Sequence, residues 1–167
     1  FVGGEMFRDH APKESLNVAQ DRFNANKTSL REYQEEVFDL VDESPAKMSY
    51  RAVQHTSIRP LAHEVCNQIW EAGGTVSVAS AGLDFYIQPV LNNAGFDRIE
   101  VHSGKVVSEP TKLPPFRYDY PSAKKECKGD WVICKCEVIN DLRNDGAGDE
   151  VIFVGDGVMS DSCAAAN

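Results

Sequence analysis

The hydrophobic positions of residues 1–57 recur at helical spacing, and this part of the chain has no run typical of a strand. The clearest helix is expected to begin at Ser29-Leu30-Arg31-Glu32, a stretch with the form of a capping box. Its end is expected at Ser44-Pro45, because proline restricts the backbone of the residue before it. A second helix is expected to begin near Arg59-Pro60, with proline in the first turn, and to stop at Gly73-Gly74.

The pattern changes after residue 74, where short apolar runs alternate with helical stretches. Each run is short and rich in β-branched residues, as in strands that are buried on both faces. Strands are therefore expected over residues 75–79, 131–134 and 150–154. Helices are expected over residues 83–93 and 137–143, where the apolar positions follow a helical period. Alternation of strands and helices predicts an α/β fold: a Rossmann-like parallel sheet with flanking helices.

Two further segments complete the expected organisation. Residues 98–107 read as a hairpin that turns at Ser103-Gly104, and residues 108–130 read as an irregular loop. The predicted division is a small helical region over 1–57 and an α/β core over 58–167. A chain of 167 residues suits one domain or a core with a small cap.

The charge balance restricts the class of partner. The formal net charge is −9, which argues against a nucleic-acid-binding surface and against binding to an anionic membrane. No apolar run is long enough to span a bilayer. A small phosphorylated ligand stays compatible with this charge, because a local positive pocket can lie on an acidic protein.

The cysteines indicate a reducing compartment. Their number is five and their spacing is irregular, so a disulfide framework is not expected, and a cytoplasmic location follows. Cys134 and Cys136, together with Cys127 or His102, can supply zinc ligands, although the usual paired spacing is missing. Buried, reduced thiols are the plainer interpretation.

Chemically distinctive residues follow three of the expected strands. Ser80 follows the first, Lys135 follows the second, and the stretch Gly155-Asp156-Gly157 follows the last, with Asp161 shortly after it. Ligands of parallel α/β sheets bind beyond the carboxyl ends of the strands. The sequence therefore predicts that a hydroxyl, an ammonium group and two carboxylates meet at one edge of the sheet.

These stretches, in this order, resemble motifs of the haloacid-dehalogenase superfamily of phosphatases. The similarity is closest to its phosphoserine-phosphatase-like branch, which includes the methionine-salvage enolase-phosphate phosphatases. VSVASAGLDFYIQPVL resembles the second motif, with Ser80 as the phosphate-binding serine, and WVICKCEVI resembles the third, with Lys135 as its lysine. VIFVGDGVMSDSCAA resembles the fourth motif in its longer Gly-Asp-x-x-x-x-Asp form. Residues 1–57 then correspond to the helical cap of this branch.

The resemblance implies a role for each position. Ser80 and the backbone N–H groups of Ala81 and Gly82 would bind the phosphate, and the positive end of the following helix would face it. Lys135 would neutralise the charge that spreads over the equatorial oxygens during transfer. The metal ligands would be Asp156 directly and Asp161 as a second ligand or as a group that orients metal-bound water, with Mg²⁺ as the cofactor.

Each of these residues also has a plainer interpretation. Ser80 can simply cap a helix, and Lys135 can be a solvated surface residue. Asp156 can be a turn residue, because Asp-Gly is a common turn pair, and Asp161 can cap a helix.

The first motif of the family, Asp-x-Asp-x-Thr, is not found in this sequence. In the family its first aspartate is the nucleophile, and its strand lies between the strands that carry Ser80 and Asp156. Without that strand the sheet would have a gap of about 9.6 Å or two unpaired edges. The chain is therefore expected to be truncated at both ends. A missing N-terminal segment, or a second copy of the chain in a homo-oligomer, would complete the sheet.

Three hypotheses about function follow. The first is a magnesium-dependent phosphomonoester hydrolase of a small phosphorylated metabolite, acting through an aspartyl-phosphate on an aspartate outside this sequence. The second is a non-catalytic protein that keeps the phosphate and metal pocket. The third is an unrelated α/β domain whose turns imitate the motifs.

Overall fold

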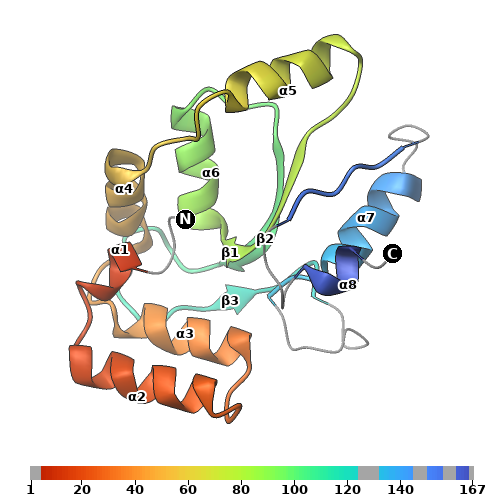
Figure 1. The fold of residues 1–167 in the computed structure, drawn as a ribbon. Coiled ribbons are helices and arrows are strands. Elements are labelled where there is room, and N and C mark those ends of the chain that lie inside the picture. Colours follow the sequence, from red (N-terminus) through yellow and green to blue (C-terminus); the bar gives the residue numbers. More distant parts are fainter. Residues whose placement is uncertain (1–4, 124–131, 145–149, 156–160, 166–167) are drawn as a thin grey trace.

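The computed structural model describes residues 5–123, 132–144, 150–155 and 161–165. The N-terminal part is helical, as expected, and its helices gather on one side of the molecule (Figure 1). They are α1 (Glu5–Arg8), α2 (Lys13–Asn24), α3 (Leu30–Leu40) and α4 (Pro45–His55).

The capping box at Ser29 is confirmed, whereas the expected end of its helix is wrong. The Glu32 backbone N–H donates to Ser29 Oγ at 3.1 Å, and the Ser29 N–H donates to Glu32 Oε2 at 2.8 Å. Helix α3 ends at Leu40, and Pro45 begins the separate helix α4. Proline is tolerated at the first position of a helix, where its missing N–H would have no partner. Ser44 Oγ accepts from the Lys47 N–H at 3.4 Å and so caps this second helix.

Helix α5 (Ala62–Glu71) begins later and ends where the sequence predicts. Its N-cap is Leu61, in a left-handed conformation with φ 66°, so Pro60 lies before the helix and not in its first turn. At the other end Gly73 has φ +83°. The Gly73 N–H donates to the Trp70 carbonyl at 3.1 Å and the Gly74 N–H to the Ile69 carbonyl at 2.9 Å. This pair of bonds is a Schellman motif, which satisfies carbonyls of the last turn.

The sheet confirms the α/β class. Its described strands are β1 (Ser77–Leu83), β2 (Glu100–Val106) and β3 (Tyr118–Asp119), in the order β1-β2-β3. Strands β1 and β2 are parallel and joined through helix α6 (Asp84–Asn93), whereas the short β3 runs antiparallel to β2. Strand β3 lies inside the segment expected to be an irregular loop. Strand β1 also continues through residues 80–82, which were expected to form a loop, with an irregular register between Ala79 and Leu83.

The expected hairpin at Ser103-Gly104 is wrong, because both residues lie within the continuous strand β2. A β-carbon at Gly104 would lie 2.7 Å from Val132 Cγ1 and 3.0 Å from Leu83 Cδ2. Glycine is therefore required here by close packing of neighbouring segments on the strand. It is not required by a turn.

Two of the expected strands are absent from the described C-terminal residues. Residues 132–134 are buried but form no strand, and they lead directly into helix α7 (Lys135–Asn144). Residues 150–155 are extended without strand pairing, and Ile152 and Val154 are 78% and 90% exposed. The short helix α8 (Ser162–Ala165) follows. An apolar run indicates burial, but it does not by itself distinguish a strand from another buried segment.

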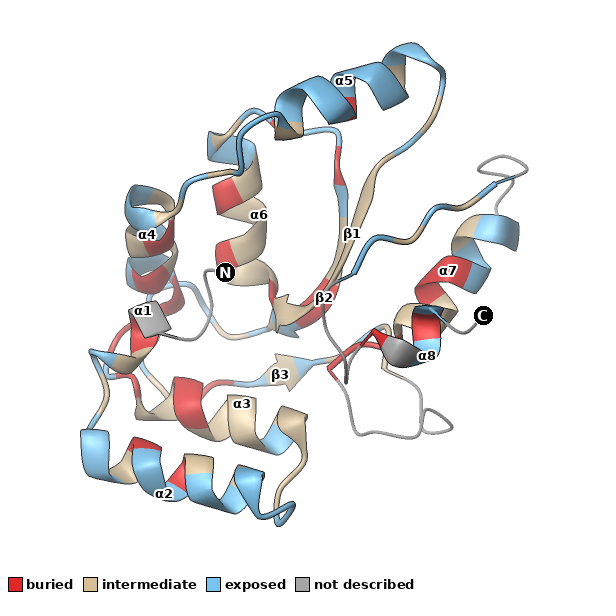
Figure 2. Ribbon diagram, in the orientation of Figure 1, coloured by how far each residue is buried: buried red, intermediate tan, exposed pale blue. Residues whose placement is uncertain are grey.

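The main hydrophobic cluster contains residues from both sides of position 57, the predicted boundary between the helical region and the α/β core. Phe38 and Met48 from the N-terminal helices pack in one cluster with Leu83 and Tyr86, and α4 packs against α6. Figure 2 shows buried positions on α3, α4 and α6 where these elements face one another. Tyr118 of β3 also donates to Asp39 Oδ1 of α3 at 2.7 Å. The division into 1–57 and 58–167 stays a prediction.

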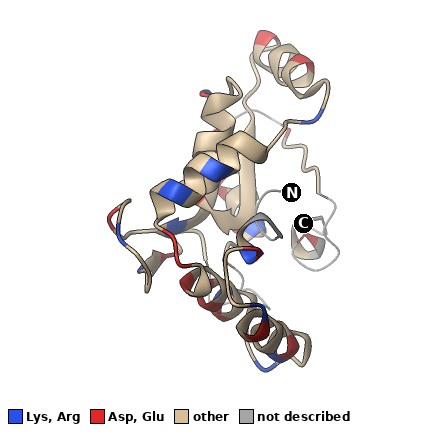
Figure 3. Cartoon of the chain, turned by 90° about the vertical axis from the view of Figure 1, so that its left-hand side faces the viewer, with Lys and Arg blue, Asp and Glu red and all other residues tan. Residues whose placement is uncertain are grey.

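Charged side chains on the N-terminal helices pair with opposite charges. Glu43, buried at the start of the turn into α4, forms ion pairs with Arg51 and with Lys47, the latter at 3.0 Å. Figure 3 shows the N-terminal helices from this side, with positions of both signs along them. Within the described part of the chain, no helix has the length and hydrophobicity needed to span a bilayer.

Candidate functional site

Two of the predicted site residues, Lys135 and Asp161, form an ion pair although 26 positions separate them. Lys135 is the first residue of α7, and Asp161 directly precedes α8, where its carbonyl accepts the Ala165 N–H at 2.9 Å. The Lys135 and Asp161 side chains are only 12% and 9% exposed. Lys135 is thus not a solvated surface lysine, and Asp161 combines a helix-start position with a charged contact.

The position of Lys135 is electrostatically unfavourable for the helix that carries it. The N-terminal end of a helix has a partial positive charge, so a lysine in the first turn is repelled. Glu137 in the same turn and the Asp161 carboxylate supply negative charge beside it. The Asp161 carboxylate therefore offsets the repulsion that Lys135 meets at the start of α7.

Gly155 allows the chain to approach the Asp161 carboxylate. A β-carbon at Gly155 would lie 2.6 Å from Asp161 Oδ2 and 2.9 Å from the Phe153 ring. Any larger residue would therefore displace the carboxylate or the backbone beside it. The neighbouring predicted ligand, Asp156, and Gly157 lie outside the described residues.

Ser80 makes a local hydrogen bond at the irregular part of β1. Its Oγ accepts from the Gly82 N–H at 3.1 Å, so one of the backbone donors expected to bind phosphate is already used. The Ser80 O–H stays available as a donor, since a hydroxyl donates and accepts at the same time. Helix α6 begins two residues after Gly82, and no side chain caps its first turn. The first N–H groups of a helix have a partial positive charge, which favours anions in general, although the first turn of α6 also carries the Asp84 carboxylate.

The contact between Gly82 and Tyr86 was not predicted from the sequence. A β-carbon at Gly82 would collide with the Tyr86 hydroxyl and would lie 2.9 Å from Ile87 Cδ1. Burial raises the pKa of Tyr86 to about 12, so the phenol stays protonated at neutral pH. A glycine followed four residues later by a tyrosine on a helix is the pattern that would have pointed to this contact.

One cavity lies between the first residues of β1 and Lys135. It has a volume of about 710 Å³ and is lined by β1 from Ser77 to Ala79, by Lys135 and by the segment 150–154. Ser80, Ala81, Gly82 and Asp161 are not among its lining residues, although Ser80 directly follows Ala79 and Asp161 contacts Lys135. The roles assigned to Ser80, Ala81, Gly82, Lys135 and Asp161 stay predictions.

The described residues supply part of a metal-ligand set. No group of three or more His, Cys, Asp or Glu side chains that could hold a metal ion occurs within the described ranges. Asp161 offers a carboxylate, the type of donor that Mg²⁺ prefers, beside the Lys135 ammonium. For zinc, Cys134 is buried and Cys136 is half-buried, and Cys127 lies outside the described residues.

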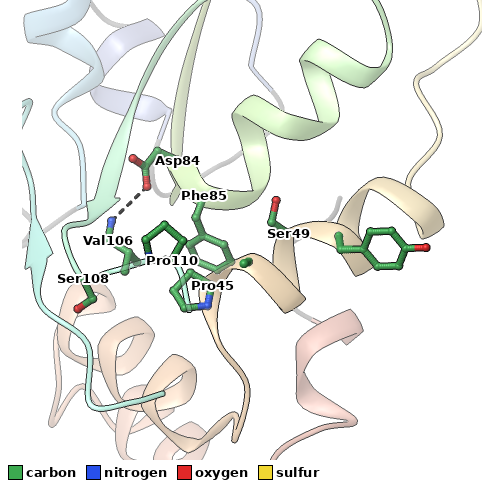
Figure 4. Close-up of a pocket in the computed structure, with 9 residues that line it drawn as sticks. Pro45, Ser49, Asp84, Phe85, Val106, Ser108 and Pro110 are labelled. Atoms are coloured by element: carbon green, nitrogen blue, oxygen red, sulfur yellow. Dashed lines mark hydrogen bonds between the residues drawn. The ribbon is translucent and has the colours of Figure 1, made fainter. Parts of the chain in front are cut away.

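A second cavity, of about 450 Å³, lies between α4, the start of α6 and the segment after β2 (Figure 4). Ser49, Asp84 and Ser108 are among its lining residues. Asp84 Oδ1 accepts the Val106 N–H at 3.1 Å, and Ser108 Oγ accepts the Arg117 N–H at 2.9 Å. Two of its polar groups therefore already bond to the backbone of the fold.

Comparison with known proteins gives a distant relationship. No protein-family model matches the chain. The chain is 27% identical over 169 aligned positions to the bifunctional enzyme MtnB/MtnX of Bacillus licheniformis, in an alignment that covers 96% of this chain and 38% of that protein. The chain thus spans well under half the length of this relative. A solved structure, cytosolic 5'-nucleotidase IIIB bound to cytidine, matches with a TM-score of 0.44 and 17% identity over 66% of this chain and 43% of that one.

Proposed function

We propose that this chain forms the phosphate- and Mg²⁺-binding part of a phosphomonoester hydrolase of the haloacid-dehalogenase type. Its substrate is a small phosphorylated metabolite, and the protein acts in the cytoplasm. The observation that carries the proposal is the buried Lys135–Asp161 pair, whose lysine lines the same cavity as the first residues of β1. The similarity to a bifunctional enzyme favours a catalytic protein over a purely structural one.

The residues of the chain have distinct roles in this proposal. Ser80 O–H and the first N–H groups of α6 bind the phosphoryl oxygens, and Lys135 neutralises their charge. Asp161 and Asp156 hold Mg²⁺, which supplies additional positive charge at the phosphoryl group when it is bound. Asp161 also fixes the Lys135 ammonium in place before the substrate arrives, so less reorganisation accompanies binding.

The nucleophile is an aspartate outside this sequence. Its carboxylate oxygen forms a bond to phosphorus while the ester P–O bond breaks, and the leaving alkoxide takes up a proton from water. Water then attacks the phosphorus of the aspartyl-phosphate, which releases inorganic phosphate and restores the carboxylate. This chain alone is therefore expected to bind phosphate without turning over an ester.

Binding of inorganic phosphate in the presence of MgCl₂, measured by equilibrium dialysis, tests the site. Lys135→Met is expected to weaken binding by about tenfold or more, since it removes a charge-assisted hydrogen bond. Lys112→Met, on an exposed loop, is the matched control and should bind as the unchanged chain does. Lys135→Arg keeps the charge and separates loss of binding from loss of folding. Equal binding by Lys135→Met and Lys112→Met would refute the proposed site.

Turnover is tested with a polypeptide that also carries the nucleophilic segment. Hydrolysis of p-nitrophenyl phosphate should require Mg²⁺ and stop with EDTA, and a phosphorylated aspartate should be trapped during turnover. Phosphate binding with no hydrolysis by that longer polypeptide would favour the non-catalytic binding protein.

A further inference from the structure

Two tyrosines hold the chain around β3 against helix α3. The Tyr118 hydroxyl donates to Asp39 Oδ1 at 2.7 Å, and the Tyr120 hydroxyl donates to Glu35 Oε1, also at 2.7 Å. Glu35 and Asp39 are four residues apart, so both carboxylates lie on one face of the helix. The Arg31 guanidinium, one turn earlier, lies 5.2 Å from the centre of the Tyr120 ring. Bonds from a hydroxyl to a carboxylate are stronger than bonds between neutral groups, so both tyrosines are firmly tied to α3.

The two tyrosines differ in what else fixes them. Tyr118 belongs to β3, which pairs with β2, and the Phe116 N–H donates to the same Asp39 oxygen at 3.1 Å. The backbone at Tyr118 therefore keeps its place without the hydroxyl. Tyr120 follows the strand, so its bond to Glu35 is a larger share of what holds the chain there.

The chain beyond Tyr120 contacts the start of α7, toward which it runs in Figure 1. The Tyr120 carbonyl accepts the Ala123 N–H at 3.1 Å, which closes a turn. Within this turn the Ser122 carbonyl accepts the Cys134 N–H at 2.7 Å. The Cys134 carbonyl accepts N–H groups from the first turn of α7, as the residue at an N-cap does. Lys135 follows directly, as the first residue of the helix.

Tyr120 and the residues before α7 also pack at one place on β2. A β-carbon at Gly104 would lie 3.0 Å from Tyr120 Cε1 and 2.7 Å from Val132 Cγ1. Val132 is fully buried and lies two residues before Cys134. The Tyr120 ring is therefore connected to the start of α7 by packing as well as by the backbone bond.

We infer that Tyr120 is a positioning residue for Lys135 and acts through the Ser122 carbonyl and Cys134. The inference rests on the proposed function, in which Lys135 binds the phosphoryl oxygens. Because Lys135 is next in the chain, a displacement of Cys134 moves it directly. A charged group binds well only when surrounding bonds and packing hold it in the required geometry. Through Tyr120, the anion site therefore depends on α3, a helix of the N-terminal region.

Tyr120→Phe and Tyr118→Phe form a matched pair of variants. Each removes one hydroxyl that donates to a carboxylate of α3 at 2.7 Å, so their urea midpoints should fall by similar amounts. Tyr120→Phe should also reduce the coupling energy between Lys135 and Asp161 by more than half, measured by a double-mutant cycle in that background. Tyr118→Phe should leave this coupling unchanged. Glu35→Gln keeps an oxygen that accepts from Tyr120 and should retain the coupling.

Amide hydrogen exchange measures the intermediate step. Exchange at Cys134, whose N–H donates to the Ser122 carbonyl, should become about tenfold faster or more in Tyr120→Phe. It should stay unchanged in Tyr118→Phe. The dissociation constant for inorganic phosphate, measured with MgCl₂, should rise about threefold or more in Tyr120→Phe and not in Tyr118→Phe.

Three results would overturn the inference. One is an equal loss of coupling in Tyr118→Phe and Tyr120→Phe, because the hydroxyls would then act only on stability. Another is unchanged exchange at Cys134 in Tyr120→Phe. The third is a phosphate affinity that Lys135→Met lowers and Tyr120→Phe does not. Coupling and exchange are measured without phosphate, so they decide this inference separately from the comparison of Lys135→Met with Lys112→Met, which decides the proposed site.

Discussion

Separate and joint replacement of Lys135 and Asp161 tests whether their contact is a buried, coupled ion pair. The variants are Lys135→Met, Asp161→Asn and the double variant. Both side chains are nearly inaccessible, at 12% and 9% exposure. Removal of one partner leaves the other charge buried beside a neutral group, which costs about 3–5 kcal/mol in such sites.

The double variant should be much less destabilised than the sum of the two single variants. It contains no unpaired charge, and an apolar methionine packs in place of the lysine stem. We expect a coupling energy of about 2–3 kcal/mol, at the upper end of values for residues in contact. Urea unfolding followed by circular dichroism gives the free energy of unfolding for each of the four chains.

The ion pair between Arg22 and Glu36 is the internal control. Its side chains are 44% and 33% exposed, so water screens the charges. The corresponding cycle, with Arg22→Met and Glu36→Gln, should give a coupling energy of about 0.2–1 kcal/mol that declines with added salt. Additivity of Lys135→Met and Asp161→Asn within about 0.5 kcal/mol would refute the buried pair.

Three further changes test single features of the fold. Burial raises the pKa of Tyr86 from 10 to about 12. The chain should therefore lose up to about 2.7 kcal/mol of stability as the pH rises from about 10 to 12, because Tyr86 ionises only in the unfolded state over this range. Tyr86→Phe should remove that part of the alkaline loss, measured by urea unfolding at several pH values. Gly155→Ala should destabilise the chain by about 1–3 kcal/mol through its clash with Asp161, and it should weaken phosphate binding. Ser29→Ala should cost about 1 kcal/mol by removing the side chain that accepts the Glu32 N–H, measured as a lower urea midpoint.

Local signals predicted the helices well because their causes are local. The capping box at Ser29 and the glycine stop at Gly73 depend on residues within one turn, and the structure has both. Pro45 was interpreted as the end of one helix, whereas it begins another. The sequence alone could not decide between these, because proline is compatible with both positions.

The sequence-based prediction of strands was wrong where contacts with distant segments, and not strand pairing or turns, determine the composition. Ser103-Gly104 has the composition of a turn, but Gly104 lies inside β2 because Val132 and Leu83 approach its backbone. Val132 is a distant residue in the sequence, so no local window contains the reason. Residues 132–134 are buried, and no strand pairing accompanies that burial.

The candidate site stays a prediction of residue types, and its contacts were not predicted. Resemblance to family motifs pointed to Ser80, Lys135 and Asp161, but no pattern pairs Lys135 with Asp161 across the segment between them. The bond from Gly82 N–H to Ser80 Oγ was equally hidden, since it depends on the irregular register of β1 after Ala79.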